Sequence, residues 1–151
     1  MERTATGRIL ALDVGKRRIG VAVSDELGIT AQGLQTIERR NNREDFAIIS
    51  RLASQKSARL ILVGNPINMS GTEGRQAEWV HQFAEGLGVR SGLPVKLWDE
   101  RLTSVEAGRV LRQSGASIEK RARAVDRLSA VILLQSYLDS LNLAAETEAP
   151  E

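Results

Sequence analysis

The sequence predicts an α/β protein built on a five-stranded mixed sheet with helices on both faces. Three observations lead to this class. Two apolar runs, residues 9–12 and 60–63, have the composition of strands that are buried on both faces. A segment of period two follows the first run closely, which indicates a hairpin. Further along the chain helical and extended patterns alternate, which is typical of parallel strands joined by right-handed crossovers.

The first part of the chain is expected to form three strands. The run over residues 9–12 ends at Asp13-Val14-Gly15, where Gly15 permits a tight turn. The next strand alternates Ile and Val with small residues at positions 20, 22 and 24, so one of its faces is flat. A shorter third strand is expected over residues 34–37.

The remaining chain predicts two helix–strand pairs followed by two helices. Thr103 and Glu106 form a capping-box pattern, which opens a helix that is expected to stop at Gly115. Phe83 and Leu87 belong to a helix identified by its apolar spacing. The other expected elements are a helix over 43–56, strands over 60–63 and 95–98, and a last helix over 119–141.

Composition and length indicate one domain and exclude several kinds of site. Residues 1–143 of the 151 are assigned to that domain, and residues 144–151 to a disordered acidic tail. With no Cys and one His, the chain offers no disulfide scaffold, no thiolate or His-based metal site and no Ser-His-Asp triad. The sequence has no apolar run near the roughly 18 residues of a membrane span and no leader-like start, so we expect a cytoplasmic protein without membrane contact.

Basic residues gather in two places, although the net charge is only +2. Residues 101–127 contain seven Lys and Arg against three acids, and a basic triplet follows Asp13 closely. Such clusters are more often solvated surface, but they also suit a phosphate backbone. The candidate nucleic-acid contacts are Lys16, Arg17, Arg18, Arg101, Arg123 and Arg127.

The aromatic residues and the one histidine are expected to pack rather than to act. Five aromatic side chains are scattered along the chain, which is too few for a base-stacking platform. Recognition of nucleic acid should therefore rest on shape and backbone contacts. His81, beside Val80 and Phe83, is expected at the surface or partly packed and not in catalysis.

Three carboxylates occupy positions that suit a metal site. Asp13 and Glu100 each follow a predicted strand at its carboxyl end, where the sites of such sheets lie. Asp126 shares a helix stripe with Ala130. Plainer roles stay open: a turn-forming Asp, a loop acid, and a first-turn acid favoured by the helix dipole. If the three converge, their oxygens suit Mg²⁺ or Mn²⁺, and two such ions can clamp a phosphodiester.

Four ordered segments resemble the YqgF family, also called RuvX: residues 11–25, 63–66 with Gly71, 99–104 and 126–138. The resemblance covers residues 8–141 and implies an RNase H-like fold. It also implies a divalent-metal nuclease similar to Holliday junction resolvases, in a family assigned to 5′-end maturation of the small-subunit rRNA precursor. It marks Asp13, Glu100 and Asp126 as the acidic metal-binding triad, with Gly15 and Thr103 at supporting positions.

The leading hypothesis is therefore a metal-dependent endonuclease that processes the 5′ end of pre-16S rRNA, acting as a monomer or homodimer with pre-ribosomal particles among its partners. Three alternatives stay open. One is a resolvase of four-way DNA junctions, and another is an assembly factor that binds nucleic acid without cleaving it. The third is a nucleotide phosphohydrolase of the actin and sugar-kinase type, which is disfavoured because those proteins close two such domains around the nucleotide.

Overall fold

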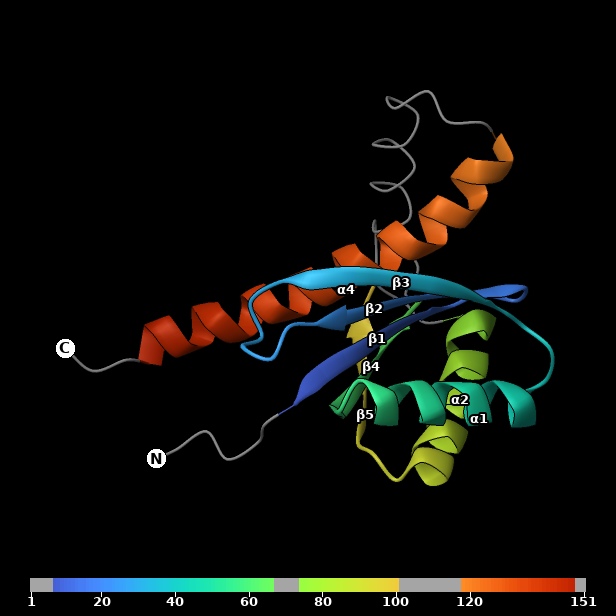
Figure 1. The fold of residues 1–151 in the computed structure, drawn as a ribbon, viewed down its shortest axis with the longest axis horizontal. Coiled ribbons are helices and arrows are strands. Elements are labelled where there is room, and N and C mark those ends of the chain that lie inside the picture. The colour runs from blue at the N-terminus through green and yellow to red at the C-terminus, as the bar shows by residue number, and fades with distance from the viewer. Residues whose placement is uncertain (1–6, 67–73, 101–117, 149–151) are drawn as a thin grey trace.

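The computed structural model describes residues 7–66, 74–100 and 118–148 (Figure 1). The helix expected over residues 103–115 lies outside the described residues, and so do Arg101 and Thr103. The described elements, in chain order, are β1 (Arg8–Val14), β2 (Arg18–Ser24), β3 (Ala31–Glu38), α1 (Asn42–Gln55), β4 (Ala58–Asn65), α2 (Arg75–Ser91), β5 (Val95–Asp99) and α4 (Ile118–Glu148).

The five strands form one mixed sheet in the order β3-β2-β1-β4-β5, which confirms the predicted class. The β1–β2 pair is antiparallel, as expected for a hairpin, and so is the β2–β3 pair. The β1–β4 and β4–β5 pairs are parallel, and the intervening chain carries α1 and α2. Because β1, β4 and β5 run the same way, their carboxyl ends meet at one end of the sheet.

Helices cover both faces of this sheet (Figure 1). On one face α1 and α2 enclose large apolar side chains, among them Leu12, Val21 and Phe83. On the other face α4 lies over small residues, including Ala11 and Ala22, which are fully buried beneath it. The flat face that the sequence predicts for β2 is therefore the surface on which α4 packs.

Local signals set the helix ends. The Asn41 side chain caps α1 by accepting a hydrogen bond from the Glu44 N–H at 2.9 Å. At the C-terminal end of α2, Gly92 adopts the left-handed conformation with φ of 74°, and its N–H donates to the Gly88 carbonyl.

Several elements are longer than predicted, among them β1, β4, β3 and α4. β3 spans Ala31–Glu38 instead of residues 34–37, because its pairing with β2 continues to the Ser24–Ala31 pair. α4 continues to Glu148, so helical backbone covers residues 144–148 of the segment assigned to a disordered tail. Neither α4 nor any other helix in the described ranges is long and apolar enough to cross a membrane.

Candidate active site

Two of the three predicted acids meet at the carboxyl end of the parallel strands. Asp13 is the penultimate residue of β1 and pairs in register with Gly20 of β2. Glu100 follows β5 directly, and its N–H donates to the Asn65 carbonyl at 3.2 Å, which continues the β4–β5 ladder by one step. The two acids therefore approach from the strands on either side of β4.

Gly64 of β4 makes room for the Glu100 side chain. A Cβ atom at Gly64 would lie 3.2 Å from Cδ and Oε2 of Glu100, and 3.2 Å from Cδ2 of Leu133 in α4. The Glu100 carboxyl group thus lies over β4 on the face that α4 covers. Asp13 lies on the same face, because it alternates with Ala11, which packs against α4.

The two carboxyl groups are joined by a hydrogen bond. Burial of the Glu100 carboxyl group, followed by the nearby charge of Asp13 and the hydrogen bond between them, raises the pKa of Glu100 to about 9. The charge of Asp99 acts in the same direction. At neutral pH the pair consequently holds one proton, which Glu100 donates to the Asp13 carboxylate.

The donor set fits a hard divalent cation. A cation between two carboxylates removes the repulsion that the shared proton relieves here, and carboxylate oxygens are ligands for Mg²⁺ and Mn²⁺. Among the side chains that the structure describes, no group of three His, Asp or Glu assembles. Asp126 has its backbone in α4, one turn before the buried Ala130, but its side chain and that of Arg123 are outside the described set.

The end of β4 also positions a polar pair that sequence analysis did not assign to the site. His81 Nε2 of α2 lies 3.2 Å from Oδ1 of Asn65, which is buried. Asn65 therefore contacts His81 through its side chain and Glu100 through its backbone carbonyl. The half-buried state of His81 agrees with the predicted partial packing, but its fixed partner is polar. The available sequence signal was that Asn65 follows the apolar run 60–63 after a single glycine.

Four of the six predicted basic contacts have described side chains. Lys16 and Arg17 are exposed in the β1–β2 turn, at the acidic end of the sheet. Arg18 opens β2 and is half-buried, and its carbonyl accepts the Gly15 N–H at 2.9 Å, which closes the predicted tight turn. Arg127 is exposed, and its Cγ and Cδ atoms lie over Gly33 of β3, two strands away from β1.

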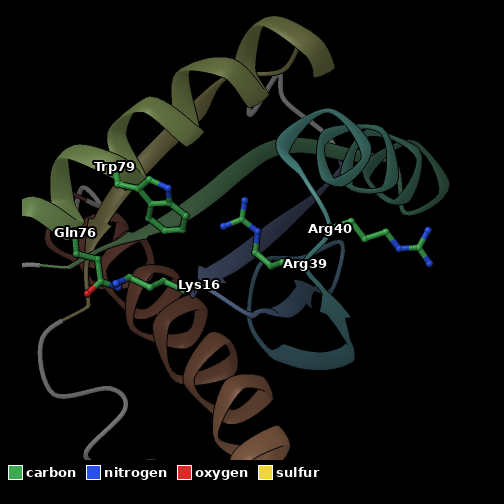
Figure 2. Close-up of a pocket in the computed structure, with 5 residues that line it drawn as sticks. All are labelled: Lys16, Arg39, Arg40, Gln76 and Trp79. Atoms are coloured by element: carbon green, nitrogen blue, oxygen red, sulfur yellow. The ribbon is translucent and has the colours of Figure 1, made fainter.

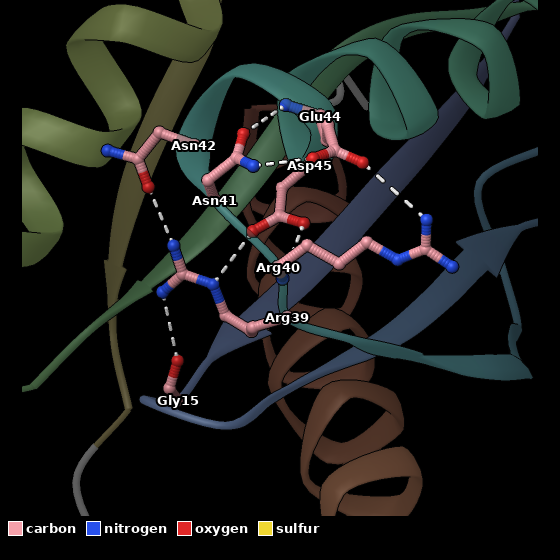
Figure 3. Close-up of polar contacts among 7 residues, drawn as sticks. All are labelled: Gly15, Arg39, Arg40, Asn41, Asn42, Glu44 and Asp45. Atoms are coloured by element: carbon pink, nitrogen blue, oxygen red, sulfur yellow. Dashed lines mark hydrogen bonds and ion pairs between the residues drawn. The ribbon is translucent and has the colours of Figure 1, made fainter.

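Arg39, which was not among the predicted residues, holds this turn in place (Figure 3). Its Nη1 donates to the Gly15 carbonyl at 3.2 Å, its Nη2 to Asn42 Oδ1 at 2.7 Å, and its Nε to Asp45 Oδ2 at 3.0 Å. The Asp45 carboxylate is fully buried. The guanidinium also lies 5.0 Å from the ring centroid of Trp79. Arg39 thus ties the end of β1 to both α1 and α2.

Sequence comparison finds close relatives over most of the chain. The family profile described as "RuvX: Holliday junction resolvase" matches residues 7–140. A "Putative pre-16S rRNA nuclease" of Koribacter versatilis is 54% identical over 140 residues, which cover 93% of this chain and 92% of the relative. A protein of the same name from Clostridium novyi is 46% identical over 134 residues, covering 89% of this chain and 99% of the relative.

Solved structures of two resolvases share the fold. The T. thermophilus RuvC structure with a Holliday junction substrate superposes with a TM-score of 0.53 and 14% identity, covering 90% of this chain and 96% of that one. Fowlpox virus resolvase, also solved with Holliday junction DNA, gives 0.55 and 14%, covering 89% of this chain and 98% of that one. At such identities the likeness concerns the fold alone, and it agrees with the expected RNase H-like fold.

Proposed function

Because this chain belongs to the RuvX family, we propose that it is a metal-dependent endonuclease that hydrolyses phosphodiester bonds in structured nucleic acid. The observation that carries the proposal is the half-buried Asp13–Glu100 pair, which shares a proton at the carboxyl end of the parallel strands. Placing two acids side by side away from water costs free energy, and a role in binding cations accounts for their presence there.

Asp13, Glu100 and Asp126 are the residues that would hold the metal, which we propose is Mg²⁺ or Mn²⁺ in a two-ion site. When bound, such ions supply Lewis acidity to the scissile phosphate and lower the pKa of a water molecule. The protein's part is to orient the ligands. The Asn65 carbonyl fixes the backbone of Glu100, and Gly64 leaves the space that its carboxyl group occupies.

Cations of the β1–β2 turn are proposed to bind the substrate backbone. Lys16 and Arg17 are exposed within a few residues of Asp13, so their charges lie where a phosphodiester would approach the acids. Arg18, Arg101, Arg123 and Arg127 complete the proposed set. Contacts of this kind position a nucleic acid and carry no sequence code.

We propose the 5′ end of precursor 16S rRNA as the substrate, because relatives that match nearly the whole chain are named pre-16S rRNA nucleases. The protein would then act in the cytoplasm on RNA within pre-ribosomal particles, as a monomer or homodimer. The second candidate substrate is a four-way DNA junction, which is favoured by the description of the family as a Holliday junction resolvase.

One purified sample tests both candidates. Precursor 16S RNA and a synthetic four-way junction are incubated with Mn²⁺ or Mg²⁺, using wild type, Asp13→Asn and a control, Glu85→Gln, which changes an exposed acid on α2. We expect cleavage of the RNA, a loss of at least about a hundredfold in Asp13→Asn, and no loss in the control. Full activity of Asp13→Asn would refute the mechanism. Binding without cleavage in any metal would identify an assembly factor.

A further inference from the structure

A cavity of about 700 Å³ opens on the α1–α2 side of the sheet (Figure 2). Its size is typical of a site for a small organic molecule. Of the five described residues that line it, three are cations and none is an acid, so this part of the cavity favours an anion. The lining residues are Lys16 of the β1–β2 turn, Arg39 and Arg40 before α1, and Gln76 and Trp79 of α2.

The cations differ in what they can offer a ligand. Arg39 uses three of its five N–H groups on protein oxygens, and Asp45 balances its charge. Arg40 points away from the other four residues in Figure 2 and pairs with Glu44 at 3.5 Å. Lys16 makes no ion pair among the described residues, and Figure 2 shows it extending toward Gln76. The most favourable position for a phosphate is therefore between Lys16 and Gln76, where it can bind the Lys16 ammonium group.

Trp79 supplies an aromatic wall beside that position. Its indole is half-buried and is fixed by the Arg39 guanidinium at 5.0 Å from the ring centroid and by Phe83 at a centroid distance of 6.4 Å. A rigid, partly exposed indole is a stacking surface for a nucleobase. Lys16 can pair with the phosphate of a nucleotide and Trp79 can stack on its base. A bare phosphate would use only Lys16.

The cavity begins where β1 ends. Lys16 is three residues beyond Asp13, which limits the separation of their Cα atoms to about 11 Å. Asp13 lies on the α4 face, whereas Phe83, against which Trp79 packs, belongs to the core on the opposite face. A strand that crossed the β1–β2 turn would therefore pass from the carboxyl pair into the cavity.

We propose that this cavity binds an unpaired nucleotide of the strand that is cleaved, with the base against Trp79 and a phosphate on Lys16. The inference rests on the proposed nuclease function and adds a substrate feature to it: a single-stranded flank next to the scissile bond. It also changes the role expected for one aromatic residue, since Trp79 takes part in recognition rather than only in packing.

Fluorescence of Trp79 tests the proposal without any cleavage. In Trp98→Phe the remaining tryptophan is Trp79, and the protein is titrated in EDTA with a short single-stranded RNA, a blunt duplex of the same length, or adenosine monophosphate. We expect saturable quenching by the single strand, with affinity at least tenfold above that of the mononucleotide, and little quenching by the duplex. Equal quenching by duplex and single strand would overturn the proposal, and tighter binding of the mononucleotide would exclude a strand as the ligand.

Fluorescence anisotropy of a labelled single-stranded RNA measures binding by variants that keep Trp98. This second measurement tests the proposal even if Trp98→Phe does not fold. Trp79→Leu should weaken binding by about 5- to 150-fold, the range of base–aromatic stacking, and Lys16→Gln should also weaken it. The matched control is Arg90→Gln, which removes an exposed charge from the last turn of α2. Equal affinities of Lys16→Gln, Trp79→Leu and the control would overturn the proposal.

The two proposals fail separately. Asp13→Asn should lose cleavage and still bind the single strand, because the cavity does not include that carboxylate. A wild-type protein that binds the strand through Trp79 but cleaves nothing refutes only the nuclease function. A protein that cleaves its substrate with the same kcat/KM after Trp79→Leu refutes only the nucleotide site.

Discussion

Glu100→Gln should make the metal-free protein more stable at pH 8 than the wild type is. The pKa of Glu100 is raised from an ordinary value of 4.5 to about 9 in the folded protein. Between these values the native state keeps a proton that the unfolded chain has released. The wild-type free energy of unfolding therefore falls as pH rises, by at most about 1.4 kcal/mol per pH unit, and the contribution is fully present only below pH 4.5.

The variant removes this pH dependence while keeping the shape of the side chain. Its amide can donate to the Asp13 carboxylate, as the protonated Glu100 does in the wild type. Two pH units, from 6 to 8, correspond to an upper limit of about 2.7 kcal/mol. Because water reaches part of the carboxyl group, we expect a gain of about 1–2 kcal/mol relative to the wild type over this interval.

Urea unfolding in EDTA at pH 5, 6, 7 and 8, followed by far-UV circular dichroism, measures the effect. Glu85→Gln, an exposed change on α2, should shift the free energy of unfolding by less than about 0.5 kcal/mol and keep the wild-type slope against pH. If Glu100→Gln has the same slope as the wild type, the carboxyl pair does not hold a proton and its assignment as a cation site loses its support.

Three further outcomes follow from the same geometry. Binding of Mn²⁺ at pH 7.5 should release about one proton, measured by calorimetry in buffers of different ionisation enthalpy, and none in Glu100→Gln. Asp45→Ala should cost about 3–5 kcal/mol in urea unfolding, because it leaves the Arg39 charge buried and unpaired, whereas Glu44→Gln should cost at most about 1 kcal/mol. Gly64→Ala should cost about 1–3 kcal/mol and reduce Mn²⁺ affinity, because the added Cβ presses on the Glu100 carboxyl group; unchanged affinity would contradict that contact.

The positions of the acids in the sheet were predictable because they depend on local signals. Asp13 closes an apolar run and Glu100 follows a short strand, and parallel pairing brings the ends of such strands together. The structure confirms that these two meet. The sequence also indicated the flat face of β2, since small residues at alternate positions specify it directly.

The hydrogen bonds of Arg39 and the cavity beside it were not predictable from the sequence. Asp45 looks like an ordinary first-turn acid, and only the tertiary structure shows that its carboxylate is buried against Arg39. Trp79 has the spacing of a core residue, and the half that stays exposed depends on how α1 and α2 meet. β3 was predicted too short because it is a half-buried edge strand with a weak apolar pattern.

Because α4 packs closely on the sheet, residues without any charge should influence the proposed metal site. The helix lies on Ala11 and Ala22 through its own Ala130, and these three are fully buried. Side-chain volume at these positions sets the height of α4 above the strands that carry Asp13. Substitutions at Ala11, Ala22 and Ala130 should thus be poorly tolerated. One added methyl group there would shift the proposed ligand Asp13 without touching it.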